Sequence, residues 1–321
     1  MKLLAKVFSV VALVVVVIFL TCLWIYRDIP ARELEAKYAE PPSRFVEVKG
    51  IRYHVRQEGS GPDALLLHAS FGSLFMWDGW VENLADQYRF TRIDLVAHGL
   101  TGSGPEESYS MDELAESLHG LLAELELDSF HLAGTSIGGI LAFTYAADYP
   151  DQVTSLTLIN SAGLIHRGVN PNPVQHSVPL KYRLLARITP RYLMDDFFRS
   201  LIHIEENATP EVLQTYYDMI MHEGNRQATL SGMRDYQPRD PSPWLSKIIA
   251  PTFVMWAENS VLPQQEAEEF IGLLEGAPST QILIIDEGGH ALPISHPISS
   301  SEAASAFWAQ VDREAVSHAN Q

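Results

Sequence analysis

The chain has 321 residues, of which 46% are hydrophobic and 19% charged, with 22 basic against 40 acidic side chains. This length and apolar content suffice for a large buried core, and they exclude a disordered or collagen-like chain. A net charge of −18 disfavours nucleic acid as a partner, because phosphate backbones repel an acidic surface. The single cysteine, Cys22, excludes an internal disulfide and a cysteine metal cluster.

The first predicted element is an uncharged run over residues 7–26, reading VFSVVALVVVVIFLTCLWIY. A helix of twenty residues rises about 30 Å, which matches the hydrocarbon core of a bilayer. The run is longer than the apolar part of a cleaved signal peptide, and Trp24, Ile25 and Tyr26 stand where its small-residue cleavage site would be. We therefore predict a transmembrane anchor with its flanks over residues 1–30. A cleaved signal peptide remains the alternative, while Cys22 matches a lipoprotein site poorly.

The charges that flank this run predict its orientation. Lys2 and Lys6 precede it, whereas Arg27, Arg32 and Lys37 after it are offset by nearby acidic residues. Positive charge favours the cytoplasmic side of a membrane. We expect a single-pass protein with a cytoplasmic N-terminus and its body on the periplasmic or extracellular side.

Residues 31–44 are polar and are expected to form a juxtamembrane linker. Beyond them, short apolar runs typical of strands alternate with amphipathic stretches typical of helices. Strands are expected at residues 45–48 and 51–56 (a hairpin), 64–68, 90–95, 129–133, 153–159, 252–256 and 281–285, and helices near 77–87, 111–125, 140–147, 263–274 and 301–315. This order predicts an α/β fold, with a mostly parallel sheet covered by helices on both faces.

One region lacks this alternation. Residues 164–248 contain helical runs with prolines and aromatics but no convincing strand. We predict a core formed by residues 45–163 and 249–321, interrupted by a helical cap that lies above the carboxyl edge of the sheet. Most apolar side chains of the cap are expected to pack its own small core.

The strongest local motif is Gly134-Thr135-Ser136-Ile137-Gly138. Gly-x-Ser-x-Gly alone is weak, because about one chain in ten of this size contains it by chance. Here it lies between a predicted strand and a predicted helix, which is typical of a nucleophile elbow, where the serine occupies a strained turn between two glycines. A glycine-rich turn without chemistry is the alternative.

With this motif, residues 45–308 resemble the α/β-hydrolase family. The further motifs that carry the resemblance are His68-Ala69-Ser70, similar to the oxyanion segment; the loop from Asp94 to Thr101; and Gly289-His290 after the last strand. The resemblance implies Ser136 as nucleophile and His290 as general base. It also implies that the backbone N–H groups of Ser70 and Ile137 form the oxyanion hole.

The chemistry of these residue types agrees with the resemblance. A serine hydroxyl is a weak nucleophile until a base removes its proton, and histidine titrates near neutral pH. Serine before histidine is also the order in which this fold carries its catalytic residues. Because Ser136 is not an aspartate, the chain is unlike the haloalkane dehalogenases and epoxide hydrolases of the same scaffold.

The catalytic acid departs from the family pattern. After the penultimate strand the sequence reads Trp256-Ala257-Glu258-Asn259-Ser260, with Ser260 in the aspartate position. Glu258 or Asn160 could replace the acid, whereas Asp286 and Glu287 lie in a short loop before His290 that rarely folds back suitably. The remaining possibility is that no acid works. Removing the acid from a serine triad lowers turnover by about 10⁴.

We therefore expect a membrane-anchored serine hydrolase that cleaves apolar carboxylic esters by way of an acyl-enzyme. Hydrolytic carbon–carbon cleavage by the same serine is one alternative. A degenerate relative that binds a ligand without turnover is another, motivated by Ser260. The sequence contains no metal-ligand cluster and no dinucleotide motif, so no cofactor and no metal are implied.

Overall fold

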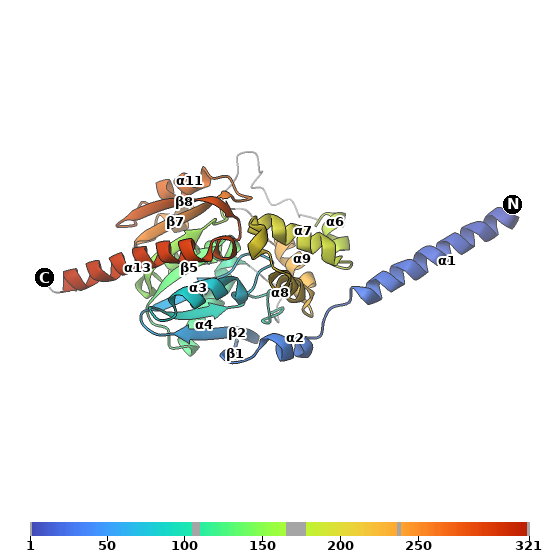
Figure 1. Cartoon of the computed structure of the whole chain (residues 1–321), viewed down its shortest axis with the longest axis horizontal. Coiled ribbons are helices and arrows are strands. Elements are labelled where there is room, and N and C mark those ends of the chain that lie inside the picture. The colour runs from blue at the N-terminus through green and yellow to red at the C-terminus, as the bar shows by residue number, and fades with distance from the viewer. Residues whose placement is uncertain (1, 105–109, 165–177, 236–238, 320–321) are drawn as a thin grey trace.

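An eight-stranded sheet forms the centre of the computed structural model, which describes residues 2–104, 110–164, 178–235 and 239–319 (Figure 1). The strands are β1 (Ser43–Val48), β2 (Ile51–Gly59), β3 (Asp63–Leu67), β4 (Arg89–Ile93), β5 (Phe130–Thr135), β6 (Val153–Ile159), β7 (Thr252–Asn259) and β8 (Thr280–Gly289). Their order is β1-β2-β4-β3-β5-β6-β7-β8. The β1–β2 and β2–β4 pairs are antiparallel and the other pairs are parallel, which confirms the predicted α/β fold.

Helices cover both faces of this sheet. On one face lie η1 (Leu74–Trp77), α3 (Asp78–Leu84), α12 (Leu292–Ser295) and α13 (Pro297–Ala319); on the other lie α4 (Met111–Glu124), α5 (Ile137–Asp148), α10 (Ser242–Leu245) and α11 (Glu266–Leu273), and η2 (Pro150–Gln152) connects α5 to β6. Each face has its own apolar core. Trp77, Trp80 and Trp308 are fully buried on the α3/α13 face, and Trp256 and Phe270 on the other. Burial of such large rings is the main favourable term in folding.

The helices between β6 and α10 lie beyond the carboxyl edge of the sheet, on the side from which α1 leads away (Figure 1). We call them the cap helices: α6 (Leu180–Leu185), α7 (Arg191–Ile202), η3 (Glu205–Asn207), α8 (Pro210–Met221) and α9 (Asn225–Asp235). In the described part of this region the elements are helical, as the sequence predicts. Residues 165–177 and 236–238 of the predicted cap lie outside the described residues.

Helix α1 (Lys2–Ile25) stands clear of the body. Its stretch Lys6–Ile25 is long and apolar enough to cross a membrane, and none of it is buried. A signal sequence would meet the same two criteria. The following polar segment differs from the expected linker, because it contains helix α2 (Ala31–Tyr38), whose Leu34 is buried in a small apolar cluster with Leu100 and Met219.

Candidate active site

The Gly-x-Ser-x-Gly motif forms the turn between β5 and α5, at the carboxyl edge of the sheet. Ser136 has φ 54° and ψ −116°, a conformation that is strained for any residue with a side chain. Four backbone hydrogen bonds hold it: Ser136 N–H donates to the carbonyl of Ile159 (3.1 Å), and the Ser136 carbonyl accepts from the N–H groups of Gly139 (3.0 Å), Ile140 (3.3 Å) and Ala162 (3.1 Å). The turn projects the Ser136 side chain from the sheet edge as a half-buried hydroxyl.

Close backbone packing explains the glycines on either side. A Cβ atom on Gly134 would lie 2.2 Å from the carbonyl oxygen of Gly138, and one on Gly138 would lie 2.4 Å from that of Leu67. Both distances are far inside van der Waals contact with backbone atoms that cannot move away. The motif is therefore required by the way β5, α5 and β3 meet at the turn.

His290 follows the end of β8 and lies next to the loop after β7. Asn259 of β7 pairs with Gly289 of β8, so the residues after each strand are neighbours. Ser260 Oγ lies 3.0 Å from Nδ1 of His290 and also accepts a hydrogen bond from Leu262 N–H at 3.2 Å. His290 is 6% exposed, and this burial lowers the pKa of its imidazole to about 4.

The other two acid candidates bond elsewhere. Glu258 is exposed, and its carboxylate accepts a hydrogen bond from Glu287 N–H at 2.8 Å. Asn160 is fully buried; its Nδ2 donates to the His290 carbonyl at 2.9 Å, and its Oδ1 accepts from Ala257 N–H at 2.8 Å. Asn160 thus joins β6 to the backbone that carries His290. Of the three candidates, the structure brings only Ser260 to the ring.

The proposed oxyanion donors come from two different elements. Ile137 is the first residue of α5, where backbone N–H groups have no partner inside the helix. Ser70 lies in the loop between β3 and η1. Ser70, Ser136 and His290 all line one cavity of about 290 Å³, together with apolar side chains of the cap such as Phe198 and Leu201.

Buried polar groups hold the Ser70 loop in place. His68 is fully buried, donates from Nδ1 to the Ala69 carbonyl (2.8 Å) and accepts at Nε2 from Leu95 N–H (2.9 Å). Both hydrogen bonds require the neutral ring, and burial lowers the pKa of His68 to about 4. His68 therefore positions the loop.

Asp94 performs a similar task one strand away. Its carboxylate accepts from Leu74 N–H and Leu100 N–H, both at 2.7 Å, and contacts His54 Nδ1 at 2.7 Å. Burial acts to raise the pKa of Asp94, but the adjacent His54 and these hydrogen bonds hold it below its usual value. The sequence analysis matched Asp94 to a family loop and missed its partner His54, which only the β2–β4 pairing brings close.

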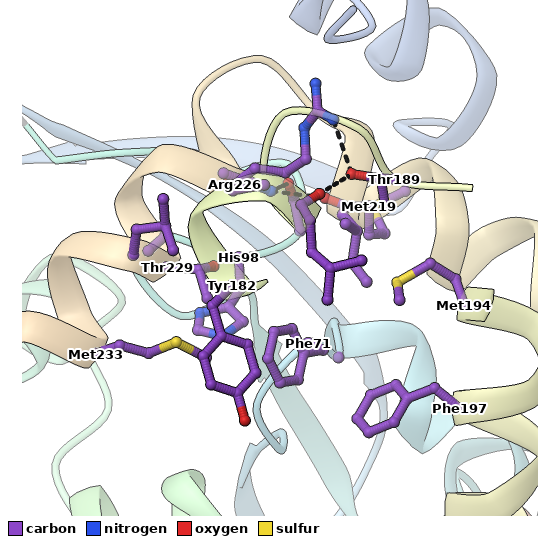
Figure 2. A pocket seen from close by; sticks show the side chains of 18 of the residues that line it. Phe71, His98, Tyr182, Thr189, Met194, Phe197, Met219, Arg226, Thr229 and Met233 are labelled. Carbon is purple, nitrogen blue, oxygen red and sulfur yellow. Dashed lines mark hydrogen bonds between the residues drawn. The ribbon is translucent and has the colours of Figure 1, made fainter. Parts of the chain in front are cut away.

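A second, larger cavity of about 480 Å³ lies among the cap helices (Figure 2). Its lining is mostly apolar and includes Tyr182, Met194 and Met219, with His98 and Arg226 as its main polar members. Phe71 and Phe197 line both cavities, and their rings meet edge to face at 5.6 Å. Phe197 belongs to the predicted cap, whereas no motif in the sequence marks Phe71.

Among the described residues, no group of three or more His, Cys, Asp or Glu side chains is arranged to hold a metal ion. The site as it stands is a serine hydroxyl, a neutral imidazole, candidate N–H donors and an apolar space beside them. Such a set can activate an oxygen nucleophile and stabilise a developing oxyanion.

Comparisons with known proteins agree with the observed fold. A family model described as "alpha/beta hydrolase fold" matches residues 65–297. Monoacylglycerol lipase abhd6-B of Xenopus laevis is 28% identical over 264 residues, which cover 78% of this chain and 76% of that protein.

Solved structures of similar fold include a membrane phospholipase A described as a novel bacterial virulence factor. It has a TM-score of 0.64 and 24% identity, and the match covers 97% of this chain and 99% of that chain. A thermophilic esterase from Thermogutta terrifontis has a TM-score of 0.69 and 22% identity, and the match covers 84% of this chain and 98% of that chain. At these identities, the similarity shows that this chain has the same fold as the two solved structures.

Proposed function

Because the chain belongs to the α/β-hydrolase fold family, we propose that it is a serine hydrolase that cleaves apolar carboxylic esters by way of an acyl-enzyme. The observation that carries this proposal is the shared cavity of Ser136, His290 and Ser70 at the carboxyl edge of the sheet. The strained elbow at Ser136 supports it further, since backbone strain persists where the surrounding structure requires it and often marks a functional site.

In the proposed reaction, the Ser136 hydroxyl attacks the ester carbonyl while Nε2 of His290 takes its proton. The N–H groups of Ile137 and Ser70 donate to the oxyanion of the tetrahedral intermediate. His290 then protonates the leaving alcohol, which leaves an acyl group on Ser136. Water, deprotonated by His290, releases the acid in the second half of the reaction.

Ser260 is the proposed orienting group for His290. If Nδ1–H donates to Ser260 Oγ at 3.0 Å, Nε2 is left unprotonated and can act as the base. A serine hydroxyl cannot supply the negative charge that stabilises the imidazolium, so we expect slower turnover than a triad with aspartate would give.

The substrate class is proposed from the lining of the two cavities. The larger cavity has space for an alkyl chain, and it is bounded by side chains such as Leu185, Leu193 and Met233. Apolar walls favour an apolar acyl group because its transfer from water is favourable. The similarity to a monoacylglycerol lipase supports a lipid monoester as the substrate.

We place the protein in a membrane through α1, with the N-terminus in the cytoplasm and the body on the outer side, from Lys2 and Lys6 before the apolar stretch. Protease added to intact cells or spheroplasts should digest the body and spare the anchor. Full protection of the body would reverse the orientation, and a mature protein that lacks residues 1–25 or so would identify a signal peptide.

A fluorophosphonate probe tests the chemistry directly. The full-length protein in detergent should be labelled, and Ser136→Ala and His290→Ala should not be. Ser129→Ala, at an exposed serine on the far end of β5, is the matched control and should be labelled normally. Labelling that survives Ser136→Ala would disprove the assignment.

The second candidate function, a non-catalytic binding protein, is favoured by the uncharged Ser260 beside His290. It predicts no labelling of the wild type and no hydrolysis of p-nitrophenyl esters of any chain length. Binding of a fatty-acyl ligand without turnover would then support it.

A further inference from the structure

We infer that the cap is a second membrane-contacting element, whose exposed apolar and basic side chains dock on the anionic headgroups of the bilayer that holds α1. The residues concerned, which we call the docking face, are Leu180, Lys181, Tyr182, Arg183, Leu184, Arg187 and Tyr192. The docking itself is independent of catalysis. Its consequence, direct passage of lipid from the bilayer into the larger cavity, rests on the proposed function.

The first observation is that the segment leaving α1 is bound to the cap. Arg226 of α9 is nine-tenths buried, and its guanidinium donates to the Tyr26 carbonyl at 2.7 Å and to the Asp28 carboxylate at 2.6 and 2.9 Å. The same side chain donates to Thr189 Oγ1 at 2.8 Å, and both Arg226 and Thr189 line the larger cavity (Figure 2). Ile29 completes this connection, because its N–H donates to the carbonyl of Met221 at the end of α8 (2.7 Å) and its carbonyl accepts from Glu223 N–H (3.0 Å).

A second connection joins α2 to the cap. Lys37 Nζ and Tyr38 Oη both donate to the Asp218 carboxylate at 2.7 Å, and Asp218 on α8 is buried. A buried carboxylate with several donors is costly to break, because its loss of partners leaves an uncompensated charge. Residues 26–38 are thus part of the cap's structure, so the cap is held close to the point where the chain leaves the membrane.

The docking face has the charge that a bilayer surface selects. Residues 179–194 contain four basic side chains and no acidic one, in a chain with a net charge of −18. Arg191 pairs with Asp195 at 2.6 Å, so Lys181, Arg183 and Arg187 carry the excess of positive charge. Lys181, Arg183 and Arg187 are exposed, and among the described residues none of them forms an ion pair. An anionic membrane repels the rest of this acidic protein. The local excess of positive charge therefore favours contact of the membrane with the docking face and with no other part of the surface.

Exposed apolar side chains accompany these charges. Leu180 is 65% exposed, Leu184 49% and Tyr192 66%. Basic and large apolar side chains thus occur together on α6 and the start of α7. Such a combination is typical of surfaces that lie in the headgroup region. A bilayer can receive both kinds of side chain, and α1 leads away from the same side of the molecule (Figure 1).

The docking face also borders the larger cavity. Tyr182 is exposed and yet lines the cavity, as do Leu193 and Met233 nearby. Figure 2 shows Tyr182 between Met233 and Phe71, and Phe71 also lines the smaller cavity that contains Ser136. A face that rests on the headgroups would therefore present the cavity to lipid chains.

Depth measurements on the reconstituted full-length protein test the docking. Cys22 is the only cysteine, so a Cys22→Ser background allows a single environment-sensitive fluorophore to be placed by Leu184→Cys. The matched control is Ile282→Cys, at an exposed apolar position on β8, away from the cap. The vesicles contain phosphatidylcholine and about 30 mol% phosphatidylglycerol. In them we expect nitroxide-labelled lipid to quench the fluorescence of the label at 184 and not that of the label at 282.

Removing the charges tests the recognition of anionic lipid. The variant Lys181→Gln/Arg183→Gln/Arg187→Gln should lower the ratio of docked to undocked protein by roughly a hundredfold, since each basic residue near an anionic surface contributes about a factor of five. Hydrolysis of a soluble short-chain ester should be unchanged, because these side chains do not line either cavity. Turnover of a monoacylglycerol within the vesicles should fall.

Lack of quenching at 184 would overturn the inference. Quenching at 184 that does not decrease in pure phosphatidylcholine vesicles, or in the charge variant, would overturn it as well. Shielding of the label without lipid quenching, increasing with protein density, would identify a second copy on this face instead. These outcomes are read without any turnover, so an inactive protein would refute the proposed function and leave the docking result intact.

Discussion

Ser260 and His290 are joined by a hydrogen bond of 3.0 Å between Oγ and Nδ1, at the place where related hydrolases are expected to have a carboxylate. A carboxylate can only accept, so it imposes the tautomer with a proton on Nδ1. A serine hydroxyl can donate or accept, and Leu262 N–H uses only one of its lone pairs. Ser260 therefore orients the ring without imposing the tautomer that catalysis requires.

The first prediction follows from this relationship. Ser260→Asp should raise kcat for ester hydrolysis by up to about 10⁴, with little change in KM, because a carboxylate imposes the tautomer and compensates the imidazolium. Steady-state kinetics with a p-nitrophenyl ester measure the effect. Ser260→Asn is the matched control of similar size and should give no such gain. High wild-type turnover that is insensitive to Ser260→Asp, Glu258→Gln and Asn160→Ala would show that the acid lies elsewhere.

The second prediction concerns the pH profile. His290 must be neutral to act as a base, and burial lowers its pKa to about 4. The wild-type kcat/KM should therefore stay constant as pH falls from 8 through 6 and decline only near pH 4. In Ser260→Asp the new carboxylate favours the imidazolium, so the acidic limb should move toward neutral pH. A wild-type limb near pH 6.5 would contradict the assignment of His290 as the buried base.

The third prediction is a loss of stability in acid that originates at His68. Its pKa is lowered to about 4 in the folded protein, whereas an unfolded histidine titrates near 6.5. Below pH 6.5 the unfolded state binds the extra proton, so stability is lost as pH falls from about 6.5 to 4. At pH 4.5 this single residue should cost about 2–3 kcal/mol of unfolding free energy.

Urea denaturation at pH 7 and 4.5 measures that loss. His68→Gln keeps a donor and an acceptor but cannot titrate, so it should be less stable than the wild type at pH 7 and lose less stability on acidification. His203→Gln, at an exposed histidine, is the control and should resemble the wild type. An identical pH dependence in His68→Gln would refute the prediction.

The fourth prediction concerns Phe197, whose ring meets Phe71 between the two cavities. Phe197→Ala should join the two cavities into one longer space, because among the described residues only Phe71 and Phe197 line both. We expect the ratio of kcat/KM for long against short acyl chains to rise by about tenfold. Phe197→Leu retains most of the volume and serves as the control. An unchanged preference across a series of p-nitrophenyl esters would mean that the acyl chain does not pass this point.

Local patterns in the sequence were sufficient for the fold and for the position of the elbow. The alternation of strands with helices predicts a parallel sheet, and the eight-stranded sheet confirms it. The glycines around Ser136 could be recognised because their cause is local: residues two positions away on a tight turn cannot carry a Cβ atom. Similarly, an uncharged stretch of twenty residues reveals α1 by its length alone.

Contacts between distant segments could not be read in the same way. The sequence left the acid open between Glu258, Asn160 and no acid at all, with Ser260 in the aspartate position. The pairing of β7 with β8 brings Ser260 to the ring, while Glu258 and Asn160 bond to backbone atoms. A one-residue change along an extended strand reverses the direction of a side chain, so spacing alone cannot decide between neighbours.

The segment after α1 shows the same limit. Its polar composition predicts a linker, but Arg226 and Asp218 bind it to the cap from almost 200 residues away in the sequence. The composition of a segment indicates whether its side chains can be exposed to solvent. It carries no information about hydrogen-bond partners on a distant helix. The sequence by itself thus determined the sheet, the elbow and the apolar helix, whose causes lie within a few residues. The tertiary structure alone decided which side chain contacts His290 and how the cap is attached to the segment after α1, because both depend on hydrogen bonds across the fold.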